Sequence, residues 1–148
     1  MKIFRWVLAL ILAAFFIIMG GQKLGAPSPV FQYMAVQSGI GLFEPGVRIA
    51  TGLAEISAAL LILLPRTRMY GALLALAVLL GALVFHLSPW LGINAPVAFS
   101  DACNAAQSCD YADPASYVKS PMLFAMAVSF FLASLGLLFV EKQAKTFD

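Results

Sequence analysis

The chain has 148 residues, of which 62% are hydrophobic and only 11% are charged. A chain this short cannot bury so much apolar surface in a core of its own, which excludes an ordinary water-soluble domain and implies that lipid surrounds the fold. The formal net charge of +2 comes without a basic run, so nucleic acid is not expected as a partner.

Four apolar segments are long enough to cross the hydrocarbon layer as helices, which takes about 20 residues each. They are predicted over residues 4–21, 47–64, 69–90 and 121–140. Lys2 and Arg5 before the first segment also fit a signal peptide, but no small-x-small cleavage site follows, so we expect a retained span. The segments lack the two-residue alternation of a membrane β-barrel. The sequence therefore predicts a single all-α integral membrane domain over residues 1–148, a transmembrane four-helix bundle.

The loop after the first span, residues 22–46, contains the stretch SPVFQYMAVQSG. Ser28 can cap a helix that has Pro29 at its first position. Val30, Phe31, Met34 and Val36 are apolar, with Gln32, Gln37 and Ser38 among them. We predict a short interfacial helix in this first outer loop.

Four spans place both ends of the chain on the same side of the membrane. If that side is the cytoplasm, six basic residues lie inside and three outside, in agreement with the positive-inside rule. The inner residues are Lys2, Arg5, Arg66, Arg68, Lys142 and Lys145, and the outer residues are Lys23, Arg48 and Lys119. We therefore expect a multi-pass protein with both termini in the cytoplasm.

The stretch CNAAQSC places Cys103 and Cys109 in the second outer loop, about residues 91–120. Two thiols in an oxidising compartment are typical of a disulfide, which stabilises so short a loop by about 2–3 kcal/mol. The spacing differs from that of a CxxC redox or zinc motif. We predict a structural Cys103–Cys109 disulfide, with a redox-active pair as the alternative.

Polar residues inside the spans can be placed by depth, because an α-helix rises about 1.5 Å per residue. Counted from the turn PRTR between the second and third spans, Glu55 lies about 17 Å up, near the membrane centre. Arg48 and His86 lie about 28 Å up, at the outer boundary, and Lys23 reaches a similar height. The sequence thus predicts a layer of basic and titratable groups with one acid below it.

The second and third spans each carry a stripe of small and polar residues along one face. The stripes are Arg48, Gly52, Glu55 and Ala59 on the second span, and Gly71, Ala75, Ala82 and His86 on the third. Because small residues let membrane helices approach closely, we expect both stripes to face the bundle interior. Ser129 of the fourth span lies near the level of Glu55, and it either bonds to that acid or back to its own helix.

An ionised carboxylate at mid-membrane must pair, take up a proton or face water, which leaves two interpretations of Glu55 open. In the first, Glu55 and Arg48 form an ion pair that fixes helix packing. In the second, a polar pocket near the outer face binds a small molecule, a quinone head group or protons. Its residues are Lys23, Arg48, Glu55, His86 and Ser129. No metal site is expected, because a single histidine provides too few ligands for a metal ion.

Residues 4–90 contain several short motifs: GGQKLG, R...TG..E, PRTR and a histidine late in the third span. In this combination the chain resembles the DoxX-like family of small four-span membrane proteins. The resemblance implies a bacterial inner (plasma) membrane protein, and one relative is a subunit linked to a thiosulfate:quinone oxidoreductase. The matching positions are Lys23, Arg48, Gly52, Glu55 and His86. The resemblance transfers no catalytic role, and it does not cover the cysteines.

These features favour a non-catalytic accessory or assembly subunit of a redox-linked membrane complex. The chain has almost no mass outside its spans, no cofactor motif and no nucleophile–base pair. Its expected partners are the lipid bilayer and either other membrane subunits or a second copy of itself. The alternative is a membrane redox protein that binds a quinone, a lipid or another small molecule in the polar pocket.

Overall fold

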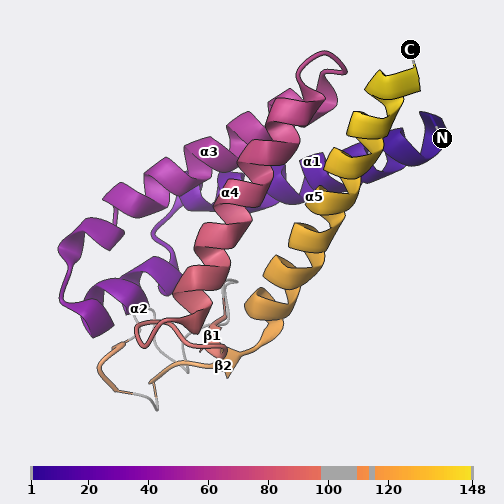
Figure 1. Ribbon diagram of the computed structural model, residues 1–148. Helices are drawn as coiled ribbons and strands as arrows, with labels where there is room; N and C mark the ends of the chain where they lie inside the picture. Colours follow the sequence, from indigo (N-terminus) through magenta and orange to yellow (C-terminus); the bar gives the residue numbers. More distant parts are fainter. Residues whose placement is uncertain (1, 98–109, 114–115, 148) are drawn as a thin grey trace.

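The computed structural model describes residues 2–97, 110–113 and 116–147, and these residues are mainly helical (Figure 1). Four segments are long and apolar enough to cross a membrane: Ile3–Gly25, Gly41–Leu63, Arg68–Leu87 and Met122–Ala144. They correspond to α1 (Lys2–Gly25), the 3-10 helix η1 (Gly41–Phe43) with α3 (Gly46–Leu63), α4 (Arg68–Leu87) and α5 (Met122–Phe147). The prediction of a mainly helical fold with four membrane-length helices is confirmed.

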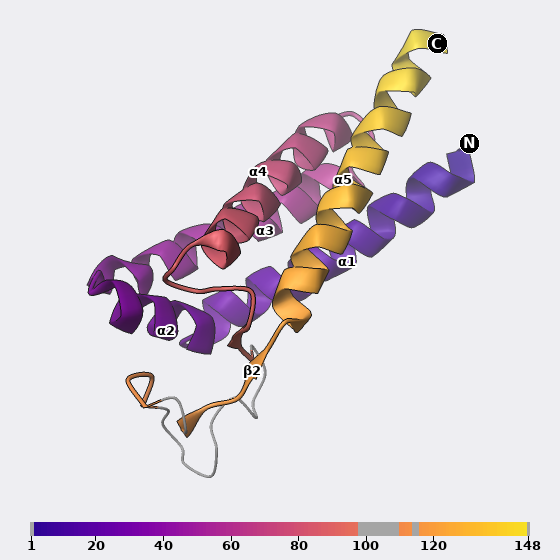
Figure 2. The ribbon, with the colours of Figure 1, turned by 60° about the horizontal axis from the view of Figure 1, so that its bottom comes forward.

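The four long helices form a closed bundle in which each helix runs opposite to the one before it. α1 packs on α3, α3 on α4, α4 on α5, and α5 returns to α1. Both chain ends and the turn between α3 and α4 lie at one end, which we call the termini end (Figures 1 and 2). The short helix α2 (Pro29–Ser38) and the strands β1 (Ala95–Pro96) and β2 (Lys119–Ser120) lie at the other, the α2 end.

The bundle interior is built mainly from small and medium-sized apolar side chains. Its buried residues include Leu12, Phe16, Ala58, Ile62, Ala72, Ala75, Leu79 and Leu137. Many large aliphatic side chains point outward instead: Leu10, Leu60 and Leu80 are each more than half exposed. An outer surface of this kind would be unfavourable in water and suits contact with lipid tails.

Close contact between helices depends on glycines at two places. A Cβ atom on Gly20 of α1 would lie 2.9 Å from the carbonyl oxygen of Gly52 on α3. A Cβ on Gly71 of α4 would lie 2.6 Å from the backbone nitrogen of Ile62 on α3. Gly52 and Gly71 both belong to the stripes predicted to face inward, and both are buried.

A second apolar cluster closes the α2 end. Phe31, Tyr33 and Met34 of α2 are buried there, together with Phe43 and loop residues that include Tyr111 and Tyr117. Lys119 Nζ donates a hydrogen bond to the Tyr33 hydroxyl at 3.0 Å, and this bond raises the pKa of Lys119. The predicted short helix is present as α2. The two-residue strands were not predicted; they pair Ala95 with Ser120 and Pro96 with Lys119.

Some details depart from the prediction or lie beyond it. α4 ends at Leu87 instead of continuing to Trp90, because Ser88 precedes Pro89 and takes up an extended conformation. α1 continues four residues past the predicted end, up to Gly25. Cys103 and Cys109 fall outside the described residues, so their disulfide stays a prediction.

Candidate functional site

A cavity of about 950 Å³ lies inside the bundle toward the α2 end. All five α-helices contribute to its wall: the end of α1, the start of α2, the first half of α3, the second half of α4 and the first turns of α5. Apolar side chains make up most of this wall, among them Phe15, Met19, Phe31, Met34, Val78 and Met126. A mainly apolar cavity of this size with few polar groups is typical of a site for a small organic ligand.

One ion pair forms part of the cavity wall between α1 and α3. Lys23 Nζ lies 2.9 and 2.8 Å from the two carboxylate oxygens of Glu55, and it also donates to the carbonyl of Met19 at 3.3 Å. Glu55 is only 6% exposed. Lys23 lies in the last turn of α1, where the helix dipole favours a positive charge. The pair therefore offsets the cost of a carboxylate placed inside an apolar span.

Arg48 lies beside this pair but does not bind the Glu55 carboxylate; its partners are Glu44 and the backbone carbonyl of Lys23. Its Nε donates to Glu44 Oε1 at 2.6 Å, and its Nη1 donates to the carbonyl oxygen of Lys23. The residue four positions after Lys23 is Pro27, which has no N–H to offer that carbonyl. Arg48 thus caps the end of α1 next to Lys23. The first interpretation of the sequence paired Glu55 with Arg48, and this is wrong: the structure pairs Glu55 with Lys23.

His86 lines the cavity from α4 and is 4% exposed. Its Nδ1 lies 2.9 Å from the carbonyl oxygen of Gly92, and its ring packs edge to face on Phe124 of α5 with the centroids 5.6 Å apart. Gly92 has a φ of 76°, a left-handed conformation that glycine adopts without strain. The loop after α4 therefore turns back and holds the imidazole in one orientation.

Ser129 is exposed and donates to the carbonyl of Ala125 on its own helix at 2.8 Å. Of the two alternatives for this residue, the bond to its own helix is the one observed. Lys23, Glu55 and His86 therefore line the same cavity, whereas Arg48 and Ser129 do not line it. Within the described residues, no group of three or more His, Cys, Asp or Glu side chains could hold a metal ion.

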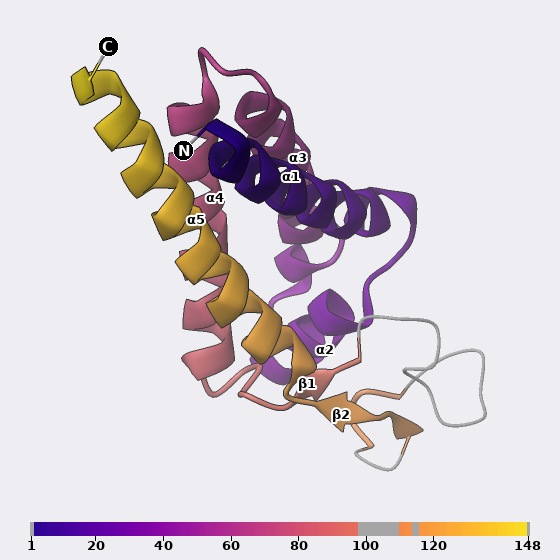
Figure 3. The same cartoon turned by 90° about the vertical axis from the view of Figure 1, so that its right-hand side faces the viewer.

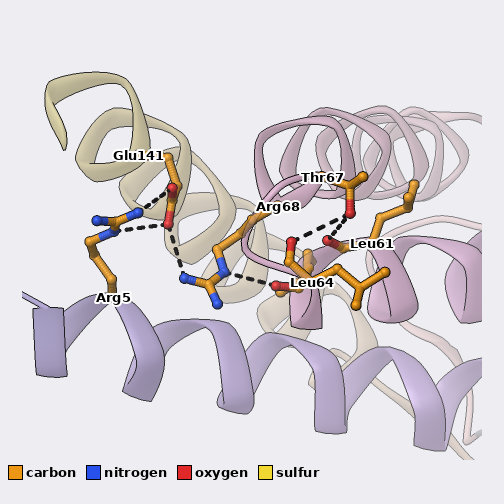
Figure 4. A network of polar contacts seen from close by, with 7 residues as sticks. Arg5, Leu61, Leu64, Thr67, Arg68 and Glu141 are labelled. Carbon is orange, nitrogen blue, oxygen red and sulfur yellow. Dashed lines mark hydrogen bonds and ion pairs between the residues drawn. The ribbon is translucent and has the colours of Figure 1, made fainter. Parts of the chain in front are cut away.

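A second charged network, at the termini end, was not predicted (Figure 4). Arg5 of α1 donates to both carboxylate oxygens of Glu141 on α5, at 3.0 and 2.6 Å. Arg68 of α4 donates to Glu141 Oε1 at 3.2 Å and to the carbonyl of Ile62 on α3 at 2.9 Å. The Arg68 guanidinium also lies 4.2 Å from the centre of the Trp6 ring. This network connects all four long helices.

Sequence reasoning missed this network because it counted Arg5 and Arg68 only as markers of orientation. The usable signal was Glu141, an acid at the end of the apolar run LGLLFVEK. An acid in that place lies at the level of both arginines when the helices are aligned by their ends. A search for acids and bases at equal depth would have found it.

The family model described as methylamine utilisation protein MauE matches residues 1–101, which are 101 of the 148 residues and include α1 to α4. The comparisons find no matching curated protein and no matching solved structure. The DoxX-like resemblance is wrong, because the matching family is a different membrane family. Its motifs include glycines that α1 and α3 need in order to cross closely, so they reflect helix packing. The chain belongs to the MauE family.

Proposed function

We propose that this protein is a non-catalytic accessory component of a redox-linked membrane system and that it binds a small amphipathic molecule in its cavity. The observation that carries the proposal is the cavity of about 950 Å³, with the Lys23–Glu55 pair and His86 in a mainly apolar wall. The family description, methylamine utilisation, supports a place in such a metabolic system.

The shape of the bundle supports an amphipathic ligand. Met19 of α1 and Met126 of α5 both line the cavity, and Figure 3 shows these two helices separating from each other toward the α2 end. Nearer the termini end, Phe15 of α1 stacks on Phe130 of α5 with ring centroids 3.6 Å apart, which closes the bundle there. A ligand could therefore keep its polar head beside Lys23 and Glu55 and extend an apolar tail between α1 and α5. A quinone or a lipid with a compact head belongs to this class.

The orientation in the membrane is also part of the proposal. The six-to-three distribution of basic residues favours both termini in the cytoplasm of a bacterial inner membrane, with the α2 end and the cavity on the outer side. A C-terminal green fluorescent protein fusion that stays dark, because it was exported unfolded, would contradict this orientation.

Native mass spectrometry of the protein, extracted gently from its own membrane, tests the binding function. Ala54→Phe places a large ring at a position that lines the cavity, and Ala14→Phe places the same ring at an exposed position on α1. We expect an additional bound mass on the wild type and on Ala14→Phe, and its loss from Ala54→Phe. A wild-type protein that carries no bound mass, or equal occupancy in both variants, would rule out the cavity as the binding site.

A further inference from the structure

The hydrogen-bonding pattern around the cavity restricts the head group that it can take. His86 Nδ1 lies 2.9 Å from the Gly92 carbonyl oxygen, and because a carbonyl only accepts, Nδ1 must carry the proton of that bond. A neutral imidazole with its proton on Nδ1 has an acceptor lone pair on Nε2. Among the described residues, none donates to that nitrogen. His86, which lines the cavity, therefore has a hydrogen-bond acceptor that no described residue uses.

The Lys23–Glu55 pair, which lines the same cavity, also offers acceptors and no spare donor. The Lys23 ammonium has three N–H groups, and it has three acceptors: both Glu55 oxygens and the Met19 carbonyl. Each Glu55 oxygen keeps a further lone pair. Thr51, which lines the same wall, donates its hydroxyl hydrogen bond to the Val47 carbonyl at 2.8 Å and has no second proton to donate. His86, Glu55 and Thr51 thus present acceptors to a ligand in the cavity.

The charge balance favours a neutral ligand. The charges of Lys23 and Glu55 cancel each other. Within the described part of the chain, no carboxylate pairs with His86, so a charged imidazole would add an uncompensated charge. A ligand charge in this apolar wall would be equally uncompensated and costly. An alkylammonium head is therefore disfavoured, although it could donate hydrogen bonds.

We infer that the cavity selects a neutral amphipath with a hydroxyl head, an alcohol or a phenol, whose O–H donates to His86 Nε2. The inference rests on the proposed function, because it requires that the cavity bind a ligand. Within the quinone class, the cavity should therefore bind the reduced form more tightly than the oxidised form. The O–H groups of a reduced head can donate to the acceptors of the cavity, whereas an oxidised head has only carbonyl acceptors of its own. Gln22 and Ser28, also on the cavity wall, can donate or accept and do not discriminate.

A pair of probes tests the hydroxyl requirement on the purified full chain: para-dodecylphenol and para-dodecylanisole, which differ in that a methyl group replaces the phenolic hydrogen. Binding of each is measured by titration in the same detergent. We expect the wild type to bind the phenol about tenfold more tightly, the effect of one buried hydrogen bond. His86→Phe keeps a ring but lacks the acceptor, so its preference should fall to near one. Ser129→Ala, the control, changes an exposed residue that lies apart from the cavity, and it should keep the wild-type preference.

Binding of the anisole by His86→Phe serves as the check that the cavity is intact in that variant. Equal binding of phenol and anisole by the wild type would overturn the inference and leave the proposed binding function standing. A preference that persists in His86→Phe would overturn the role given to His86 Nε2. Failure of the wild type to bind either probe would count against the inference and the proposed function together.

Discussion

Glu141 is 2% exposed and Arg68 is 1% exposed, so both charges are removed almost completely from the surroundings of the bundle. Their stability depends on the partners that the structure provides. Glu141 offsets two guanidinium groups, those of Arg5 and Arg68, while the indole of Trp6 covers the second of these. The acid is therefore the residue on which the network at the termini end depends.

Replacing Glu141 by glutamine should destabilise the protein by about 3–5 kcal/mol, because it leaves the buried Arg68 without a counter-charge. Unfolding in mixed micelles, followed by circular dichroism, measures the loss. Arg66→Gln removes an exposed charge at the same end of the bundle and should change stability by no more than about 0.5 kcal/mol. Equal stabilities of Glu141→Gln and Arg66→Gln would show that the network contributes little.

The Lys23–Glu55 pair at the cavity should behave as a coupled unit. Lys23→Met leaves the buried Glu55 carboxylate without its partner, and Glu55→Gln does the same to the half-buried Lys23. The double variant removes both charges. We expect the double variant to be more stable than the sum of the single losses predicts, with a coupling energy of about 0.5–3 kcal/mol. The same unfolding measurement on all four proteins gives that energy, and strictly additive losses would contradict the pairing.

At the scale of helices, α1 and α3 approach closely at Gly20, whereas the adjacent Gly21 lies away from α3. Substitutions at these two glycines should therefore have different effects on stability. Gly20→Ala places a Cβ 2.9 Å from the Gly52 carbonyl oxygen, so the helices must move apart, at a cost of about 1–3 kcal/mol. Gly21→Ala meets nothing within 4 Å and should stabilise α1 by up to about 1 kcal/mol. Thermal unfolding of the two variants compares them directly. A loss of stability in Gly21→Ala as large as that in Gly20→Ala would contradict the observed crossing.

The sequence predicts the long helices well and the connections between them poorly. A run of about 20 apolar residues can satisfy its backbone in lipid only as a helix, so each span follows from composition alone. The pairing of β1 with β2 joins residues 95–96 to 119–120 across a long loop, and nothing in the local pattern signals it. The end of α4 at Leu87 was within reach of prediction, since Pro89 restricts the residue before it.

For the cavity, helix periodicity places the polar residues on the correct faces but does not choose their partners. Arg48, Gly52 and Glu55 lie on one buried stripe of α3, as the spacing predicts. The depth argument also puts Lys23 and Arg48 at the same level, so either could reach Glu55. The choice is made by Pro27, which frees the Lys23 carbonyl to accept from Arg48, and by Glu44, which takes the other side of the guanidinium. Such three-body effects are not visible in a one-dimensional pattern.

Considered as a whole, the molecule is a bundle that charged networks connect near both ends. The network around Glu141 connects the four long helices at the termini end, and the Lys23–Glu55 pair connects α1 with α3 toward the α2 end. The space between α1 and α5 is closed by the Phe15–Phe130 stack on one side and left open as a cavity on the other. The cavity therefore lies between the Phe15–Phe130 stack and the α2 end, on the side of the bundle that carries the Lys23–Glu55 pair.

The most direct test of ligand binding is an experimental structure of the protein purified with its native lipids. We expect elongated density between α1 and α5, with its head within hydrogen-bonding distance of His86 Nε2 and next to the Lys23–Glu55 pair. A collapsed bundle in which Met19, Phe85 and Met126 fill the space between the helices would contradict it. A cavity that contains only water would also contradict ligand binding at this site.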